Sequence, residues 1–168
     1  MRDIATTIGM TAGSIYYHYP FKGDLLMAVY SEGVRRAVDA VERAVVRPAT
    51  PWVRLERAVA AHLALMVGND RDASPFAGVF VQVQPHDFPP EHHQALIGLR
   101  NAYEDLFRGL LQALPLRPAT DRSLLRLQLI GAMNHVPHWY RSKGMATPAA
   151  VARAMIRHFR VALDPARA

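Results

Sequence analysis

Apolar residues recur with helical spacing along most of the chain. In each of five segments the apolar side chains stand three or four residues apart, which places them on one face of an α-helix. In the first segment this face runs from Leu25 and Val29 to Val41 and Val45. The five predicted helices are residues 22–46, 51–67, 91–114 and 121–141 and the segment that opens at Thr147 and Pro148.

Residues that begin or end helices separate these segments. Thr120 and Thr147 each stand before a predicted helix, where a side-chain hydroxyl can accept a hydrogen bond from a free backbone N–H. Pro137 is expected to kink the fourth helix or to end its regular part. Residues 76–83 are ambiguous because their apolar residues also alternate as in a strand, but a single strand would have no pairing partner. The sequence therefore predicts an all-α fold.

The N-terminal residues show a different pattern, with two short helices on either side of a tight turn. Gly9 suits the positive φ at which helices commonly end, and Thr11 is placed to cap the helix that follows. That second helix should span residues 12–18, because Tyr19 precedes Pro20 and a residue before proline avoids the α region. Two short helices joined by a glycine turn are typical of a helix-turn-helix.

The same residues carry a specific resemblance. The stretch from Arg2 to Leu26 reads R-D-I-A-x-x-x-G and then G-S-I-Y-Y-H-Y-P-x-K-x-D-L-L. In order and spacing it resembles the DNA-binding segment of the tetracycline-repressor (TetR) family of bacterial regulators. The resemblance implies an all-helical homodimer with a helix-turn-helix domain at residues 1–30 and a larger effector-binding and dimerisation domain at residues 31–168.

The second short helix is the candidate DNA-recognition helix. Its hydroxyl, phenol and imidazole groups can donate hydrogen bonds to phosphates or base edges, and Gly13 lets the duplex come close. By resemblance, Tyr16 and Lys22 would contact phosphate, and residues 12–14 and Tyr17 would face the major groove. The alternative for Tyr16 and Tyr17 is packing in the core. The predicted DNA-binding residues are Thr11, Ala12, Gly13, Ser14, Tyr16, Tyr17, His18 and Lys22.

Charge changes this picture only slightly. The chain carries a net charge of +6, yet residues 1–46 hold five basic and five acidic residues, so bulk charge does not support DNA binding there. From residue 117 onward nine basic residues face two acidic ones, which indicates a solvated helix surface or contacts to an anionic ligand or partner. There is no cysteine, no signal peptide pattern and no long apolar run, so we expect a cytoplasmic protein without a membrane partner.

The start of the chain carries two further expectations. In the TetR pattern a longer helix precedes the one that begins near Met1, and without it Ile4, Ile8 and Ile15 would lose part of their apolar cover. At the start of the third helix, Phe21 stands where the family has a small polar cap and Gly23 follows in the first turn. Both departures should weaken the junction between the two domains, because a lost cap costs about 0.5 to 2 kcal/mol.

The effector site is predicted less sharply. The run W-Y-R-S-K-G at 139–144 resembles a TetR subgroup, several of whose members respond to acyl-CoA or steroid-degradation intermediates. His135 and His138 are three residues apart and would share a helix face, where they and Asn134 could bind a ligand or lie at a dimer seam. Ligand pockets are mostly apolar. The predicted effector residues are Met66, Phe76, Phe80, Leu99, Tyr103, Asn134, His135 and His138.

The last two helices are the candidate dimer interface. Residues 121–141 are apolar on more than one side, which is typical of a helix buried between partners. Two such helices from each protomer would make a four-helix interface around a twofold axis. The predicted interface residues are Leu125, Leu129, Met133, Val151, Met155 and Phe159.

Together these features predict a transcriptional repressor that a small hydrophobic or acyl-type effector releases from a palindromic operator. It would be no enzyme and would need no cofactor. One alternative is a dimeric ligand-binding protein that does not bind DNA. A second is a metal-dependent enzyme that uses the histidine-rich loop, although adjacent histidines on a helix point in different directions and a solvated surface is the simpler interpretation. The loop residues are His86, Asp87, Glu91, His92 and His93.

Overall fold

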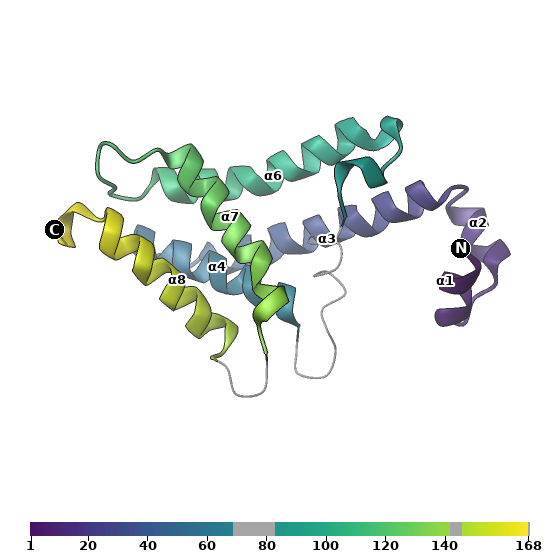
Figure 1. Ribbon diagram of the computed structural model, residues 1–168, viewed down its shortest axis with the longest axis horizontal. Coiled ribbons are helices and arrows are strands. Elements are labelled where there is room, and N and C mark those ends of the chain that lie inside the picture. Colours follow the sequence, from purple (N-terminus) through teal and green to yellow (C-terminus); the bar gives the residue numbers. More distant parts are fainter. Residues whose placement is uncertain (69–82, 142–145, 168) are drawn as a thin grey trace.

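The computed structural model describes residues 1–68, 83–141 and 146–167 (Figure 1). Over these residues the regular elements are all helical, as predicted. The ambiguous segment 76–83 lies outside the described residues except for Val83. The helices are α1 (Arg2–Thr7), α2 (Ala12–His18), α3 (Lys22–Val45), α4 (Pro51–Val67), α6 (His93–Gln112), α7 (Arg122–Trp139) and α8 (Pro148–Leu163), with 3₁₀ turns η1 (Pro85–Asp87), η2 (Pro90–His92) and η3 (Pro165–Arg167).

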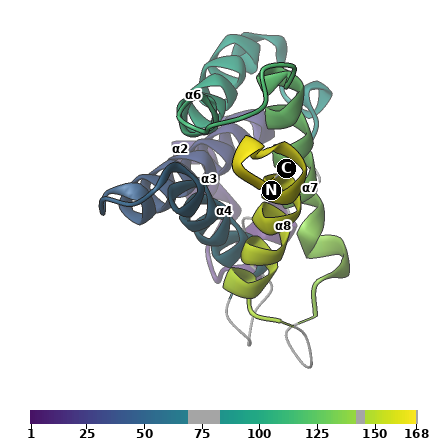
Figure 2. The same cartoon turned by 90° about the vertical axis from the view of Figure 1, so that its left-hand side faces the viewer.

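The long helices form one bundle, and α1 and α2 lie beyond its end. α3 and α6 run alongside each other, and α1 and α2 are attached at the N-terminal end of α3 (Figure 1). α4 packs against α3 on one side and α8 on the other, and α7 crosses α4 and α6 (Figure 2). None of the described helices combines the length and the apolar character that crossing a membrane requires. The candidate recognition helix α2 therefore lies next to the N-terminal end of α3, outside the bundle.

The predicted helices are found with ends shifted by up to two residues, since α3 ends at Val45, α6 spans His93–Gln112 and α7 spans Arg122–Trp139. The Thr147 hydroxyl caps α8 by accepting from the backbone N–H of Ala150 at 3.2 Å. The cap of α7, however, is Asp121 and not Thr120: its Oδ1 accepts from the N–H groups of Ser123 and Leu124. A carboxylate placed before a helix also suits the positive end of the helix dipole. α7 therefore begins at Arg122 rather than Asp121.

Pro137 lies in the last turn of α7, which ends two residues later at Trp139. Because proline has no N–H, it cannot complete the helical hydrogen bond at this position. The following turn still closes, since the Tyr140 N–H donates to the carbonyl oxygen of Val136 at 2.9 Å. The proline thus coincides with the end of the helix, as expected.

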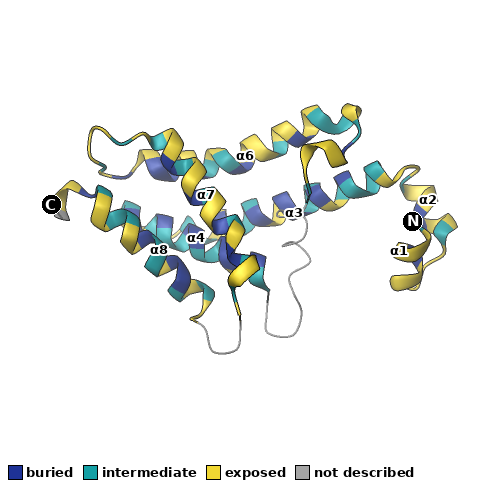
Figure 3. Cartoon of the chain, viewed as in Figure 1, coloured by how far each residue is buried: buried dark blue, intermediate teal, exposed yellow. Residues whose placement is uncertain are grey.

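The core is built where these helices face one another (Figure 3). Its largest fully buried side chains include Phe107 of α6, Leu55 and Leu63 of α4, and Leu129 and Met133 of α7. On α3 the predicted apolar face is partly wrong, because Val29 is 43% exposed. The buried residues of this helix are Met27, Tyr30, Gly33, Val34, Ala37 and Val41.

Several arginines of the basic C-terminal part bind within the protein. Arg122 donates to the carbonyl oxygens of Leu111 and Leu114, which lie where α6 ends. Arg160 pairs with Asp164 at 3.0 Å, and the carboxylate is almost fully buried. These contacts show that part of the C-terminal charge excess stabilises loops and helix ends.

Candidate DNA-recognition and effector sites

The sequence of α2 explains how this helix is held. Gly9 has a φ of 69° and turns the chain after α1, a conformation that residues with a side chain rarely adopt. The Thr11 hydroxyl then accepts from the Ser14 N–H at 3.1 Å and shares a second hydrogen bond with the Ser14 hydroxyl at 2.8 Å. Ile15 is the one buried residue of α2, at 5% exposed. At Tyr19 the backbone leaves the helical region before Pro20, as predicted.

The other side chains of α2 face outward. Tyr16 is 48% exposed and Tyr17 is 84% exposed, so core packing of these two tyrosines is wrong. Their rings and the ring of His18 are available at the surface, with the Tyr17 and His18 rings in edge contact. Of the remaining predicted DNA-binding residues, Ala12 is half-buried and Thr11, Gly13, Ser14 and Lys22 are exposed. The set is thus largely exposed on and around α2, and its contact with DNA stays a prediction.

The apolar cover of this segment is uneven. Ile15 is buried, whereas Ile4 is 36% exposed and Ile8 is 56% exposed. Two of the three isoleucines are therefore exposed. Since full burial of such a side chain is worth about 1.5 to 3 kcal/mol, α1 gains little from the two that remain open.

Asp24 and Gly23 connect the start of α3 to the turn before α6. Asp24 Oδ2 accepts from the Phe21 N–H at 3.1 Å, which supplies the acidic half of a capping box in place of the missing polar cap. Its other oxygen, Oδ1, lies 2.9 Å from His92 Nε2. A Cβ on Gly23 would stand 2.4 Å from Cγ and 2.6 Å from Cδ of Pro89, so this glycine permits a close approach. Gly23, which was expected to weaken the junction, is thus a point of close packing, whereas the Phe21 side chain is 71% exposed.

The histidine-rich loop does not converge on one point. His92 binds Asp24, and His93 Nε2 lies 3.0 Å from the carbonyl oxygen of Phe88. The His86 side chain is 81% exposed. Phe88 itself is buried and meets the Tyr30 ring of α3 edge-on, with centroids 5.5 Å apart. Within the described ranges, no group of three or more histidine, cysteine, aspartate or glutamate residues is placed to hold a metal ion. The loop instead anchors α3.

A buried polar pair lies among the predicted effector residues. The Tyr103 hydroxyl of α6 and Nδ1 of His62 on α4 share a hydrogen bond of 2.6 Å. Burial lowers the pKa of His62 to about 4 and raises the pKa of Tyr103, so both groups are neutral at neutral pH. His62 was not predicted from the sequence. The available signal was its position three residues after Val59 on the apolar face of α4.

The other predicted effector residues are less uniformly buried. Met66 is 1% exposed at the end of α4, and Leu99 is half-buried one turn before Tyr103. Asn134 is half-buried, and its Oδ1 is buried without a hydrogen-bond partner among the residues that the structure describes. His135 and His138 are exposed, with their rings 4.8 Å apart. These two histidines therefore face away from the buried pair. Phe76 and Phe80 lie outside the described residues.

The predicted dimer-interface residues differ in how far they are exposed. Leu125, Leu129 and Met133 of α7 are 5%, 1% and 0% exposed, because they pack into the core of the same protomer. Val151 is 9% exposed, and Met155 and Phe159 are half-buried against the core. The outward apolar residues of α7 are Leu124 at 52% and Leu127 at 54%. The interface stays a prediction, and any interface on α7 would use these two leucines more than the three buried residues.

Fold and surface together define a class: an all-helical protein in which a helix-turn-helix segment is joined by one long helix to a larger helical domain. The chain belongs to the tetracycline-repressor (TetR) family. The family model that matches it is described as "Tetracyclin repressor-like, C-terminal domain" and covers residues 48–163. No curated protein sequence matches the chain.

Solved structures share this fold at low sequence identity. A regulatory protein of the tetR family from Rhodococcus RHA1 superposes with a TM-score of 0.78 at 24% identity, over 94% of this chain and 82% of that one. AibR in complex with isovaleryl coenzyme A and operator DNA gives 0.77 at 21%, over 94% and 84%. The regulator FadR from Bacillus subtilis in complex with stearoyl-CoA gives 0.70 at 19%, over 92% and 83%.

Proposed function

We propose that this protein is a ligand-responsive transcriptional repressor. It binds a palindromic operator as a homodimer in the cytoplasm and leaves it when an acyl-type effector binds. The observation that carries the proposal is the outward surface of α2 in a chain of the TetR family, where hydroxyl, phenol and imidazole groups surround a single buried isoleucine. It has no catalytic role in this proposal.

The composition of α2 suits reading of the major groove by a small helix. Thr11, Gly13 and Ser14 lie at its N-terminal end, the part of a recognition helix that approaches base edges. Tyr17 is 84% exposed, so its hydroxyl can reach bases or phosphates. Lys22 supplies a positive charge at the first residue of α3. No arginine lies on α2, so the common pairing of arginine with guanine is not used.

The effector class rests on the fold neighbours and on the domain interior. AibR and FadR were each solved with an acyl-CoA, and both share the fold of this chain. The buried His62 and Tyr103 pair offers polar groups among apolar side chains, which is the usual composition of a ligand site. An acyl group would lie along the apolar residues near this pair.

The contacts of Gly23 and Asp24 offer a route from the effector to α2. α6 carries Tyr103 in its middle, and the turn just before it holds Pro89 and His92 against the start of α3. An effector that favours a different position of α6 would thereby favour a different orientation of α3 and α2. In a dimer, two recognition helices must reach major grooves about 34 to 36 Å apart, so a modest change of orientation releases the operator.

Operator binding can be measured by fluorescence anisotropy with a duplex from the promoter of its own gene. We expect saturable, salt-sensitive binding that a scrambled duplex of equal length does not reproduce. Tyr17→Ala should weaken binding at least tenfold, because it removes the most exposed side chain of α2 without opening the core. Gln112→Ala, a change at an exposed position in the last turn of α6, is the control and should bind as the unaltered protein does. Equal binding of both duplexes would refute the repressor.

Effector release can be tested on the same complex. Isovaleryl-CoA and stearoyl-CoA are added to the bound duplex, with coenzyme A alone as the control for the shared head group. We expect at least one acyl-CoA to release the duplex while coenzyme A does not. Binding of an acyl-CoA by a protein that never binds its promoter would favour the alternative of a ligand-binding dimer. Two observations support this alternative: the balanced charge of residues 1–46 and the exposure of Ile4 and Ile8.

A further inference from the structure

A hollow of about 240 Å³ opens between the C-terminal end of α3, the first turns of α4 and the second half of α6. It lies toward the end of α3 that is remote from α1 and α2 (Figure 1). Of the predicted effector residues that the structure describes, none lines it, and neither does His62. The hollow is thus a separate feature of the helical domain.

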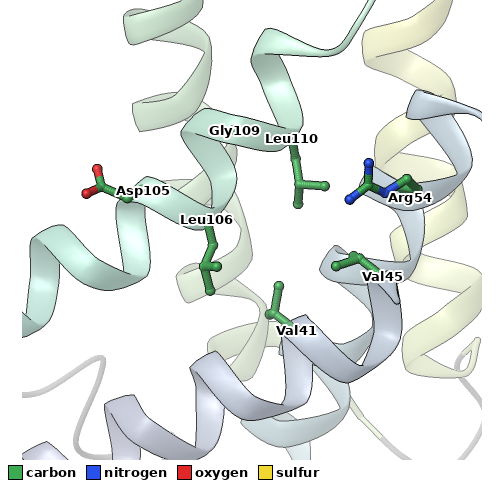
Figure 4. Close-up of a pocket in the computed structure, with 7 residues that line it drawn as sticks. All are labelled: Val41, Val45, Arg54, Asp105, Leu106, Gly109 and Leu110. Atoms are coloured by element: carbon green, nitrogen blue, oxygen red, sulfur yellow. The ribbon is translucent and has the colours of Figure 1, made fainter. Parts of the chain in front are cut away.

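One side of the hollow is aliphatic. Leu106 and Leu110 point from α6 toward Val41 and Val45 of α3 (Figure 4). Gly109 lies between the two leucines on α6, and a Cβ built there would meet no atom within 4 Å. The backbone of α6 is therefore open at this point. These walls suit a short apolar group, which would remove aliphatic surface from water.

The polar side of the hollow is a single arginine. Arg54 extends from α4 toward Leu110 (Figure 4), and its Nε is buried with no hydrogen-bond partner. Over residues 1–68, 83–141 and 146–167, no ion pair includes its guanidinium group. A cation that is partly removed from water without a partner is costly, and an anion beside it recovers that cost.

The one acidic residue at the hollow does not serve this purpose. Asp105 is turned away from Arg54 (Figure 4) and forms an ion pair with Arg108 on its own helix. Its carboxylate is thus already neutralised on the outer side of α6. Asp105 is therefore not the counter-charge of Arg54.

We propose that this hollow binds a small apolar carboxylate, such as a short aliphatic acid. The carboxylate accepts two parallel hydrogen bonds from the Arg54 guanidinium, a geometry that arginine favours. The hydrocarbon lies against Leu106, Leu110 and the two valines. The volume exceeds the roughly 150 Å³ that holds benzene in an engineered cavity and falls below the roughly 300 Å³ at which drug-sized sites begin. A complete acyl-CoA is too large, so the site is distinct from the proposed effector site.

The test is a titration of the isotope-labelled full chain with hexanoate, followed by amide NMR shifts. Saturable shifts should centre on Val45, Leu106 and Gly109. Hexanamide, which has the same hydrocarbon and no charge, should bind at least tenfold more weakly. No saturable binding at millimolar hexanoate, equal binding of the two compounds, or shifts centred on Tyr103 and Asn134 would each overturn the proposal.

Three variants locate the site. Arg54→Gln should weaken hexanoate binding at least tenfold, whereas Arg43→Gln, the same charge change at an exposed position of α3 outside the hollow, should leave it unaltered. Gly109→Leu should abolish binding by filling the mouth, and leucine is the better helix former, so folding is retained. Unaltered affinity in Arg54→Gln or Gly109→Leu would overturn the proposal. No DNA is present in these titrations, so their outcome is independent of the proposed repressor function.

Discussion

The helix-turn-helix segment and the helical domain are held together in different ways. α1 and α2 bury one side chain each, Ala5 and Ile15, and present most of their surface to solvent (Figure 3). The domain contains a continuous core in which Leu55, Phe107 and Met133 are at most 1% exposed. Hydrogen bonds and turns therefore carry much of the order in the segment, whereas burial of apolar surface dominates in the domain.

The two regions also differ in how burial affects the chemistry of their side chains. In the helix-turn-helix segment the candidate functional groups are exposed, so their chemistry can be inferred from the sequence alone. In the domain, burial changes the groups themselves: His62 is neutral and Tyr103 keeps its proton because both are out of water. A change in the core should therefore unfold the domain, and a change in the segment should mainly affect DNA binding.

Phe107→Ala is expected to have the largest effect. The ring is fully buried and lies 5.4 Å from the Tyr103 ring between centroids, so truncation leaves a cavity at the centre of the domain. Such changes cost about 3 to 5 kcal/mol in the free energy of unfolding. Urea denaturation followed by circular dichroism measures the loss. Ile15→Ala is the matched change in the segment: it should abolish operator binding while moving the main unfolding transition much less. Equal shifts from the two variants would contradict the comparison.

The pH dependence of stability should reveal the buried histidine. The pKa of His62 is about 4 in the folded protein and near 6.5 when unfolded, so the unfolded chain binds more protons between these values. The contribution of neutral His62 to the free energy of unfolding is complete above pH 6.5. It is lost as the pH falls toward 4, by roughly 3 kcal/mol over the whole window. Denaturation midpoints at several pH values measure this slope.

His62→Gln should flatten the slope, since glutamine can still form a hydrogen bond with Tyr103 but does not titrate. His158→Gln, a change at an exposed histidine of α8, should leave the slope unaltered. A slope that survives the loss of His62 would show that other groups cause the acid sensitivity.

The sequence predicted what depends on local pattern and missed what depends on distant contacts. The helices and the caps at Thr11 and Thr147 were predicted because each is decided within a few residues. The predicted effector and dimer residues on α7 could not be sorted into inner and outer faces, because this helix is apolar on several sides. The hydrogen bond between His62 and Tyr103 joins residues of two helices, so no local pattern announces it.

Gly23 is the clearest case of a residue whose role appears only in the fold. From the sequence it was expected to cost helix stability, yet Pro89 occupies the space that a side chain would need. Gly23→Ala should lower the free energy of unfolding, because overpacking costs about 1 to 3 kcal/mol and outweighs the gain of about 1 kcal/mol from alanine in a helix. Urea denaturation decides the sign. Gly98→Ala in α6, where a Cβ meets nothing within 4 Å, should instead stabilise the protein. If both variants raised the free energy of unfolding, Pro89 would be able to move and make room for the new side chain at little cost.

The smallest effect on stability is expected from a change at the N-terminal cap of α2, which tests whether hydrogen bonds hold this helix in place. Thr11→Ala removes the hydroxyl that accepts from Ser14, at a cost of about 0.5 to 2 kcal/mol. Because α2 has only one buried side chain, this cost should appear as local opening and leave the unfolding of the domain unaltered. Hydrogen exchange at the amides of Ser14 and Ile15 should quicken several-fold, and operator affinity should fall by a similar factor. Thr7→Ala, whose hydroxyl donates to the carbonyl oxygen of Asp3 within α1, is the matched control and should leave exchange in α2 as it is. If Thr11→Ala instead lowered the stability of the whole domain, α2 and the bundle would unfold as one unit, and their different packing would not make them independent.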